Sequence, residues 1–378
     1  MARTLSIQSQ TAQTLTAYVR SEWFLAISAA TSLYFVGWGA PLHAKVSNPA
    51  WLTFTLFWLF AVILGSALCV VRHAEHLAAR LGEPYGTLIL TMSVTFIEVM
   101  SISAIMLHGD NNPTLPRDTL FAVVMIILNG MVGLSLLFGG LKHREQHYNL
   151  QGANTYLGVI IPLVVLSLIL PNFTQTTAGP TLSFAQQMFL VVVAVGLYAA
   201  FLTMQTGRHR EYFTLIEETA AEKKAEAARP LLPSALLLIA YMVPVVLLAE
   251  HLARPVDYLI ETIKMPAALG GVIMAVLVAT PEAIGAVRAA TANHLQRSIN
   301  IFLGSVLSTI GLTIPAMLLI SNLTGRSMVL GVEHADMVML LLTLTVSVVT
   351  FASGRTNILQ GSVHLVLFAA YVLLIAQG

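Results

Sequence analysis

Apolar residues fill long, nearly uninterrupted stretches of the chain, and short segments rich in charged residues, Pro, Asn and Gly separate them. A helix needs about 20 apolar residues to cross a bilayer, and these stretches approach or exceed that length. They are too continuously apolar for the strands of a membrane barrel, and lipid admits only helices and closed barrels. The pattern therefore predicts an all-α membrane protein with about eleven spans, at residues 22–40, 50–71, 86–107, 119–141, 154–171, 184–204, 234–254, 267–290, 298–321, 328–350 and 358–376.

Composition agrees with a lipid-embedded chain. Hydrophobic residues make up 57% of the sequence and charged residues 10%, whereas soluble proteins carry about 25% charged residues. The formal net charge of +1 provides no basic excess for a nucleic-acid partner. A single cysteine, Cys69, excludes an internal disulfide and a cysteine-based metal cluster. We therefore expect the lipid bilayer as the surrounding medium and no bound cofactor, and the oligomeric state stays open.

One long polar connection divides the chain. Residues 205–233 hold five acidic and five basic side chains, and we expect them to form a cytoplasmic linker. The Glu and Lys pattern around residues 215–228 suits a short exposed helix. The linker separates a first five-helix unit, residues 50–204, from a second, residues 234–378, and leaves residues 1–49 as an extra N-terminal helix with its loop.

The distribution of Lys and Arg predicts the orientation in the membrane. Of the 19 Lys and Arg residues, 14 fall on the same side of the predicted spans as the N-terminus. Positive residues accumulate in cytoplasmic loops, so the N-terminus is expected in the cytoplasm. An odd number of spans then places the C-terminus outside. The first apolar stretch is long enough to remain as a helix and does not fit a cleavable signal.

The two halves share short patterns that indicate an internal repeat. The segment Gly86–Glu98 can be laid on Gly270–Glu282, and Asn129–Gly133 can be laid on Asn300–Gly304. Equivalent helices are five spans apart, so the second copy enters the membrane from the opposite side. Inverted repeats of this kind are an architecture of secondary transporters, in which the substrate binds near the midplane between the copies. The span at 22–40 lies outside this arrangement.

Two carboxylates, Glu98 and Glu282, lie well inside predicted spans. An ionisable side chain at this depth costs a few kcal/mol, so it is a candidate for function unless it is a permanently protonated structural group. Asn129 and Asn300 add two amide oxygens, although an intramembrane Asn can also simply join helices. Carboxylate and amide oxygens are hard ligands that suit Ca²⁺ or another hard cation, and backbone carbonyls or water would complete the set.

Several residues flank the two carboxylates. Proline removes a main-chain hydrogen bond and frees carbonyls in the preceding turn, whereas glycine permits close helix packing or local unwinding. Hydroxyl side chains can add ligands or line the route of the ion. These flanking candidates are Gly86, Thr95, Gly270, Gly271, Thr280 and Pro281.

Histidines are expected outside the site. His73 and His76 lie near Glu75 without forming a zinc-binding HExxH pattern, and we expect a solvated loop there. His364, near a predicted helix end, is expected at the membrane interface.

The stretches GEPYGTLILTMSVTFIEV (83–99) and LVATPEAIGAVRAATANHLQRSINIFLGSVLSTIGLTIP (277–315) resemble the two α-repeats of the cation/calcium exchanger superfamily, most closely its bacterial calcium/proton antiporter branch. The segment GRHREYF (207–213) is similar to the start of the linker in that branch. The resemblance implies an eleven-helix exchanger in the bacterial plasma membrane. It also implies cation ligands at Glu98, Asn129, Glu282 and Asn300.

The two carboxylates also suggest how cation and proton movement would be coupled. Two carboxylates can release two protons when one divalent cation binds, which leaves the site neutral in both loaded states. This favours a secondary transporter that exchanges Ca²⁺ for H⁺, with Na⁺/H⁺ or K⁺/H⁺ exchange as the alternative on the same residues. A cation channel fits the inverted repeat less well, and an intramembrane enzyme would need a catalytic dyad that the sequence lacks.

Overall fold

A computed structural model describes residues 22–43, 46–82, 85–107, 113–214 and 231–377. Within these ranges the chain forms eleven apolar helices, one at each predicted span. Eight of them are long and apolar enough to cross a membrane, and three further apolar helices are shorter. The short helix expected at 215–228 lies outside the described residues.

The first half of the chain contains six apolar helices, two of which change their helical type along their length. Inside the helix that covers 115–143, one π-helical turn interrupts the α-helical hydrogen-bond pattern. The elements are α2 (Trp23–His43), α3 (Pro49–Leu81), α4 (Tyr85–Leu107), α5 (Leu115–Met125), η1 (Ile126–Met131), α6 (Val132–His143), β1 (Gln146–His147), α7 (Leu150–Val164), η2 (Val165–Ile169), η3 (Leu170–Phe173), α8 (Phe184–Thr206) and η4 (Arg210–Tyr212).

The second half contains five apolar helices, and a π-helical turn again interrupts one of them, within residues 295–324. The elements are α10 (Leu231–Glu261), α11 (Ala268–Thr291), α12 (Leu295–Ser308), η5 (Thr309–Thr313), α13 (Ile314–Thr324), α14 (His334–Thr350), β2 (Arg355–Thr356) and α15 (Ile358–Gln377).

Helix α3 shows how local sequence sets a helix boundary. The side chain of Asn48 accepts hydrogen bonds from the main-chain N–H groups of Ala50 and Trp51, and Pro49 occupies the first turn, where its missing N–H costs nothing. Gly82 caps the C-terminal end of the helix, and its φ of 67° favours glycine. The helix continues to Leu81 and includes His73, which is fully buried. The prediction of a solvated loop around His73 and His76 is therefore wrong.

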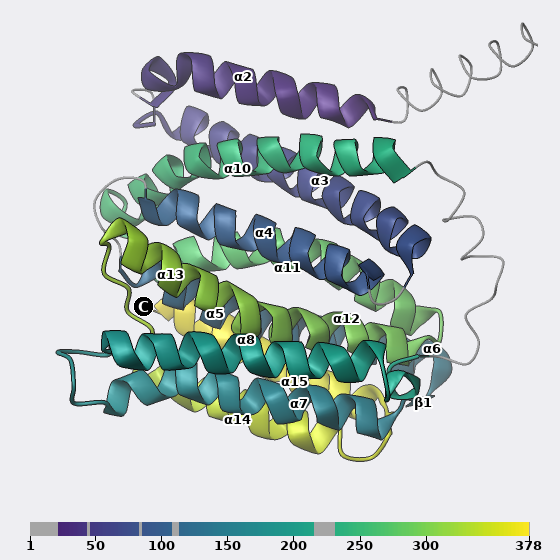
Figure 1. Cartoon of the computed structure of the whole chain (residues 1–378). Coiled ribbons are helices and arrows are strands. Elements are labelled where there is room, and N and C mark those ends of the chain that lie inside the picture. Colours follow the sequence, from purple (N-terminus) through teal and green to yellow (C-terminus); the bar gives the residue numbers. More distant parts are fainter. Residues whose placement is uncertain (1–21, 44–45, 83–84, 108–112, 215–230, 378) are drawn as a thin grey trace, which may run out of the picture.

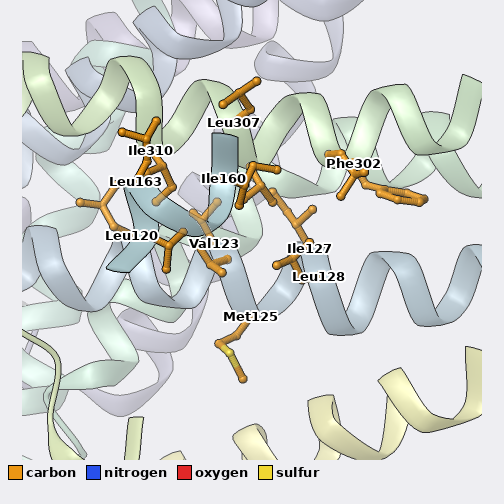
Figure 2. Packing of buried hydrophobic residues seen from close by; sticks show 14 of the residues in the cluster. Leu120, Val123, Met125, Ile127, Leu128, Ile160, Leu163, Phe302, Leu307 and Ile310 are labelled. Atoms are coloured by element: carbon orange, nitrogen blue, oxygen red, sulfur yellow. The ribbon is translucent and has the colours of Figure 1, made fainter. Parts of the chain in front are cut away.

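Two hydrophobic cores fill the molecule. The larger core lies among α5 to α8 and α12 to α15, and Figure 2 shows its residues from several of these helices interlocking. The smaller core lies among α2, α3 and α10, which form the upper layer in Figure 1. Helices α4 and α11 lie between the two, since Ile97 and Leu277 belong to the smaller core, and Ile102 and Ala279 to the larger one.

The helix ends meet in two groups at opposite ends of the bundle (Figure 1). At one end, β1 pairs antiparallel with β2, and the His143 ring lies 2.9 Å from the Thr291 carbonyl oxygen. At the other end, the Val329 N–H donates to the carbonyl of Pro113, and Asn172 donates to the carbonyl of Val332. The midpoints of α4 and α11 therefore lie far from either end.

Candidate functional site

Glu98 on α4 is almost completely buried, with 1% of its surface exposed. One of its carboxylate oxygens, Oε2, accepts hydrogen bonds from the hydroxyls of Thr313 at 2.6 Å and Thr309 at 3.1 Å. The other oxygen, Oε1, is buried and has no hydrogen-bond partner among the described residues, and neither has Oγ1 of Thr95, less than one turn earlier. A buried polar atom without a partner is costly. These two oxygens are therefore candidates to contact a cation or a proton.

Glu282 is the second intramembrane carboxylate and lies on α11, where it is half-buried. Its Oε2 accepts a hydrogen bond from the hydroxyl of Ser305 on α12. The preceding residue, Pro281, is buried inside the helix, which continues through it to Thr291. Because proline has no N–H, the carbonyl of Leu277 lacks its usual helical donor. The sequence around Glu282 thus supplies a carboxylate together with a main-chain oxygen that can accept a further bond.

A single helix connects the two carboxylates. Ser305, Thr309 and Thr313 follow one another at intervals of four along α12 and η5, so they share one face of that helix. Four residues advance a helix by about 6 Å, which places the partner of Glu282 about one turn from those of Glu98. The two carboxylates are close enough for their charges to interact. These three hydroxyl residues were not predicted from the sequence, although their spacing of four is visible in the segment 277–315.

The flanking glycines allow helices to pack closely. A Cβ atom on Gly271 would lie 2.6 Å from the main-chain carbon of Asp118 on α5. A Cβ atom on Gly86 would lie 2.6 Å from the carbonyl oxygen of Ala78. Gly270 lies against Val256 of α10, at 3.3 Å by the same measure. Helix α11 is α-helical throughout, and the Thr280 hydroxyl donates back to the Val276 carbonyl. Packing therefore accounts for these residues without local unwinding.

The side-chain amides of the two asparagines donate hydrogen bonds to groups other than the two carboxylates. Asn129 lies in the π-helical turn η1, and its Nδ2 donates to the Thr343 hydroxyl of α14 at 2.8 Å. Asn300 lies in the second turn of α12, and its Nδ2 donates to the carbonyl of Phe213 at 2.6 Å. The two residues occupy different levels of their helices, so their alignment in sequence does not correspond to equivalent surroundings. Their role as cation ligands stays a prediction.

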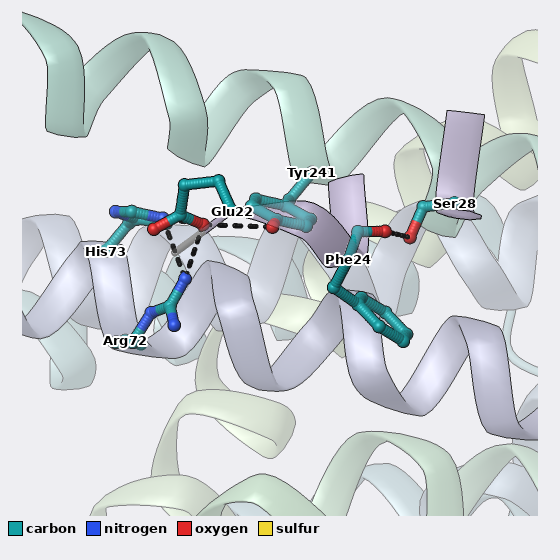
Figure 3. A network of polar contacts seen from close by, with 6 residues as sticks. All are labelled: Glu22, Phe24, Ser28, Arg72, His73 and Tyr241. Carbon is teal, nitrogen blue, oxygen red and sulfur yellow. Dashed lines mark hydrogen bonds and ion pairs between the residues drawn. The ribbon is translucent and has the colours of Figure 1, made fainter. Parts of the chain in front are cut away.

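A third buried carboxylate, Glu22, lies at the start of α2 and was not singled out from the sequence. Its Oε2 lies 2.6 Å from Nη2 of Arg72 and 3.4 Å from Nε2 of His73, and it accepts a hydrogen bond from the Tyr241 hydroxyl at 2.9 Å. Figure 3 shows these side chains converging from α3 and α10.

The surroundings of Glu22 favour its charged form. Burial acts to raise the pKa of Glu22, but the hydrogen bond from Tyr241 and the charge of Arg72 outweigh it and hold the pKa below its ordinary value of 4.5. The Ser28 and Ser66 hydroxyls, 2.8 Å apart, add a second contact between α2 and α3. This network fastens α2 to the pair formed by α3 and α10.

The chain is similar to known proteins in both sequence and structure. The sodium/calcium exchanger protein family matches residues 51–207 and 233–377. A putative ionic transporter of Sinorhizobium fredii, y4hA, is 45% identical over 320 residues, which cover 83% of this chain and 86% of that protein. The sodium-potassium/proton antiporter ChaA of Escherichia coli is 39% identical over 318 residues, with 83% and 86% covered.

A solved structure has the same fold. The native structure of YfkE superimposes with a TM-score of 0.73 over 94% of this chain and all of that chain, at 19% sequence identity. A second structure, of a selenium-substituted YfkE described as a Ca²⁺/H⁺ antiporter, gives a TM-score of 0.68 at 20% identity.

Proposed function

Because this chain belongs to the sodium/calcium exchanger protein family, we propose that it is a multi-pass membrane antiporter that exchanges a hard cation for protons at Glu98 and Glu282. The observation that carries the proposal is the geometry of these two carboxylates. They come from the two helices that separate the hydrophobic cores, and both bind to the hydroxyl-bearing face of α12 and η5. The relatives support it, since they include a sodium-potassium/proton antiporter.

The exchange rests on the charge of the site. Two ionised carboxylates without a cation would leave two negative charges in a medium of low dielectric constant, which is strongly unfavourable. Binding a divalent cation or two protons makes the site neutral. Only the loaded states can then change their access from one side of the membrane to the other, and cation movement is coupled to proton movement in the opposite direction.

Ca²⁺ is our first candidate for the cation. Two carboxylates match its charge. Ca²⁺ takes about six to eight oxygen ligands, and the hydroxyls of Ser305 and Thr95, with the freed carbonyl of Leu277, add hard oxygens to those of the carboxylates. The structural likeness to a protein described as a Ca²⁺/H⁺ antiporter agrees with this choice.

A monovalent cation is the second candidate, and the 39% identity to a sodium-potassium/proton antiporter favours it. One Na⁺ or K⁺ with one retained proton also neutralises two carboxylates. Both candidates therefore predict proton coupling, but with two protons per divalent ion and one per monovalent ion.

We further propose an inverted repeat in the plasma membrane of a bacterium, with the N-terminus in the cytoplasm and the C-terminus outside. The π-helical turns η1 and η5 each interrupt the third helix of one five-helix unit and support the repeat, while the first unit also holds a further π-helical turn, η2. Bacterial relatives support the location.

The experiment is cation flux into liposomes that contain the purified protein, with Ca²⁺, Na⁺ or K⁺ offered separately, with and without an imposed pH gradient. An antiporter accumulates its cation only when protons move the other way, and the cation that accumulates identifies the substrate. Flux that needs no pH gradient would indicate a channel and contradict the proposal.

A further inference from the structure

His364 is a buried ionisable side chain that the proposed exchange does not use. It lies on α15 near the start of that helix, and its side chain is completely buried inside the protein. An ionisable residue inside a membrane protein is costly unless it has polar partners and a role. The question is therefore which groups surround its ring.

Both ring nitrogens of His364 have polar partners. Nδ1 lies 3.4 Å from Oδ1 of Asn129, and Nε2 lies 3.0 Å from the hydroxyl oxygen of Thr350. The main-chain carbonyl of Leu128 also lies near the imidazole. The chain of bonds continues from Nδ2 of Asn129 to the Thr343 hydroxyl at 2.8 Å. The four side chains are all at most 2% exposed.

These partners assign the tautomer of the ring. Oδ1 of Asn129, which faces Nδ1 of His364, can only accept a hydrogen bond. Nδ1 must therefore carry the hydrogen. The Thr350 hydroxyl can donate to Nε2, which satisfies the neutral ring without a buried charge. One directed series of hydrogen bonds thus runs from Thr350 through His364 and Asn129 to Thr343.

The turn that His364 contacts is the π-helical turn η1, Ile126–Met131. A π-helical turn inserts one extra residue into a helix and disturbs the regular pairing of its carbonyl groups. His364 supplies a donor to the side chain of Asn129 within this turn. Helix α15 is held close at this level, because a Cβ on Gly361 would lie 2.6 Å from the main-chain nitrogen of Leu137 on α6.

On its other faces η1 packs against α11 and α12, the helices that carry Glu282 and Ser305. Its shape therefore affects how these two helices are placed. We propose that His364, as the Nδ1–H tautomer, is a positioning residue that maintains the π-helical turn η1 and thereby holds α11 and α12 in register for cation binding. This inference rests on the proposed function, and it gives Asn129 a place in the support of the turn.

The test uses two amide substitutions that differ in which ring nitrogen they imitate. His364→Asn places an N–H near the position of Nδ1 and should keep the apparent cation affinity within about twofold of the wild type. His364→Gln reaches toward the position of Nε2, and His364→Phe has no donor, so both should weaken the apparent affinity about tenfold, the effect of one lost buried hydrogen bond. Ser362→Ala, which removes a hydroxyl bonded within α15, is the control.

Nitrogen-15 NMR of histidine-labelled protein supplies a readout that does not depend on transport. The signal that disappears in His364→Asn belongs to His364, and we expect it to show hydrogen on Nδ1. Hydrogen on Nε2, or equal affinities in the Asn and Phe variants, would overturn the inference while wild-type exchange continued. A wild-type protein that exchanges no cation would instead contradict the proposed function.

Discussion

At the residue scale, the two intramembrane carboxylates differ in their surroundings. Glu98 is sealed from solvent and accepts two hydroxyl hydrogen bonds on one oxygen, whereas Glu282 is half-buried and accepts one.

The variants Glu98→Gln and Glu282→Gln each remove a negative charge that the cation needs. Breaking a buried charge pair costs about 3–5 kcal/mol, so exchange should fall by two orders of magnitude or more. Flux assays would measure this, with Glu261→Gln at the exposed end of α10 as the control, and near-normal exchange in either variant would refute a two-carboxylate site.

For Asn300 we expect a smaller effect on cation affinity than for the two carboxylates. Asn300 donates to the Phe213 carbonyl, and its Oδ1 accepts from Gln296 at 3.0 Å. The bond to Phe213 ties α12 to the segment that follows α8. Asn300→Ala should therefore leave the apparent cation affinity within about twofold, a change under 0.5 kcal/mol, and should lower thermal stability instead. Cation titrations on the purified variant would check this, and a tenfold loss of affinity would instead support Asn300 as a ligand.

The carboxylates could be found from sequence because charge inside an apolar span is conspicuous. Their hydroxyl partners could not, because Ser and Thr are frequent in membrane helices and only the packing of α4 and α11 on α12 selects Ser305, Thr309 and Thr313. His364 and Glu22 lie close to helix ends, where sequence indicates contact with water. In the structure, neighbouring helices extend past those points and bury both side chains.

At the element scale, all eleven predicted spans correspond to helices, because the length of an apolar stretch is a direct requirement of the bilayer. The π-helical turns had no sequence signal, since an extra residue in a helix is stabilised by tertiary contacts such as that of His364 with Asn129. The end of α3 was also missed. Charged and histidine residues after residue 71 suggested a loop, but the helix continues because its inner face packs on α10.

The contacts of Glu22 give a prediction about pH. Since its pKa in the folded protein lies below the ordinary value of 4.5, Glu22 stabilises the fold above that pH, and its contribution is lost as the pH falls through the lower, folded value. Glu22→Gln should lower the midpoint of thermal unfolding by a few degrees at pH 7. The difference from the wild type should shrink below pH 4.5.

Thermal unfolding in detergent from pH 8 to pH 3 would measure both effects. Tyr241→Phe, which removes the hydrogen bond and leaves the charges, should give a smaller shift with the same direction. A difference between Glu22→Gln and the wild type that stayed constant down to pH 3 would show that the charge of Glu22 does not contribute.

At the scale of the whole molecule, the proposed orientation can be tested with single cysteines. Ser353, between α14 and α15, should face the cytoplasm, and Thr176, between η3 and α8, should face outside. With Cys69 replaced by serine, a membrane-impermeant thiol reagent added to intact cells should label Thr176→Cys and not Ser353→Cys. Everted vesicles should show the reverse, and labelling of both residues from one side would contradict the alternation of the spans.

The central claim is that cation and protons share Glu98 and Glu282, and counting protons during cation binding tests it most directly. Purified protein in weakly buffered solution would be titrated with Ca²⁺, Na⁺ or K⁺ between about pH 6 and pH 9 while proton release is recorded. Shared carboxylates predict binding that weakens as pH falls, with up to two protons released per divalent ion or one per monovalent ion. Cation binding that is independent of pH and releases no protons would contradict the account.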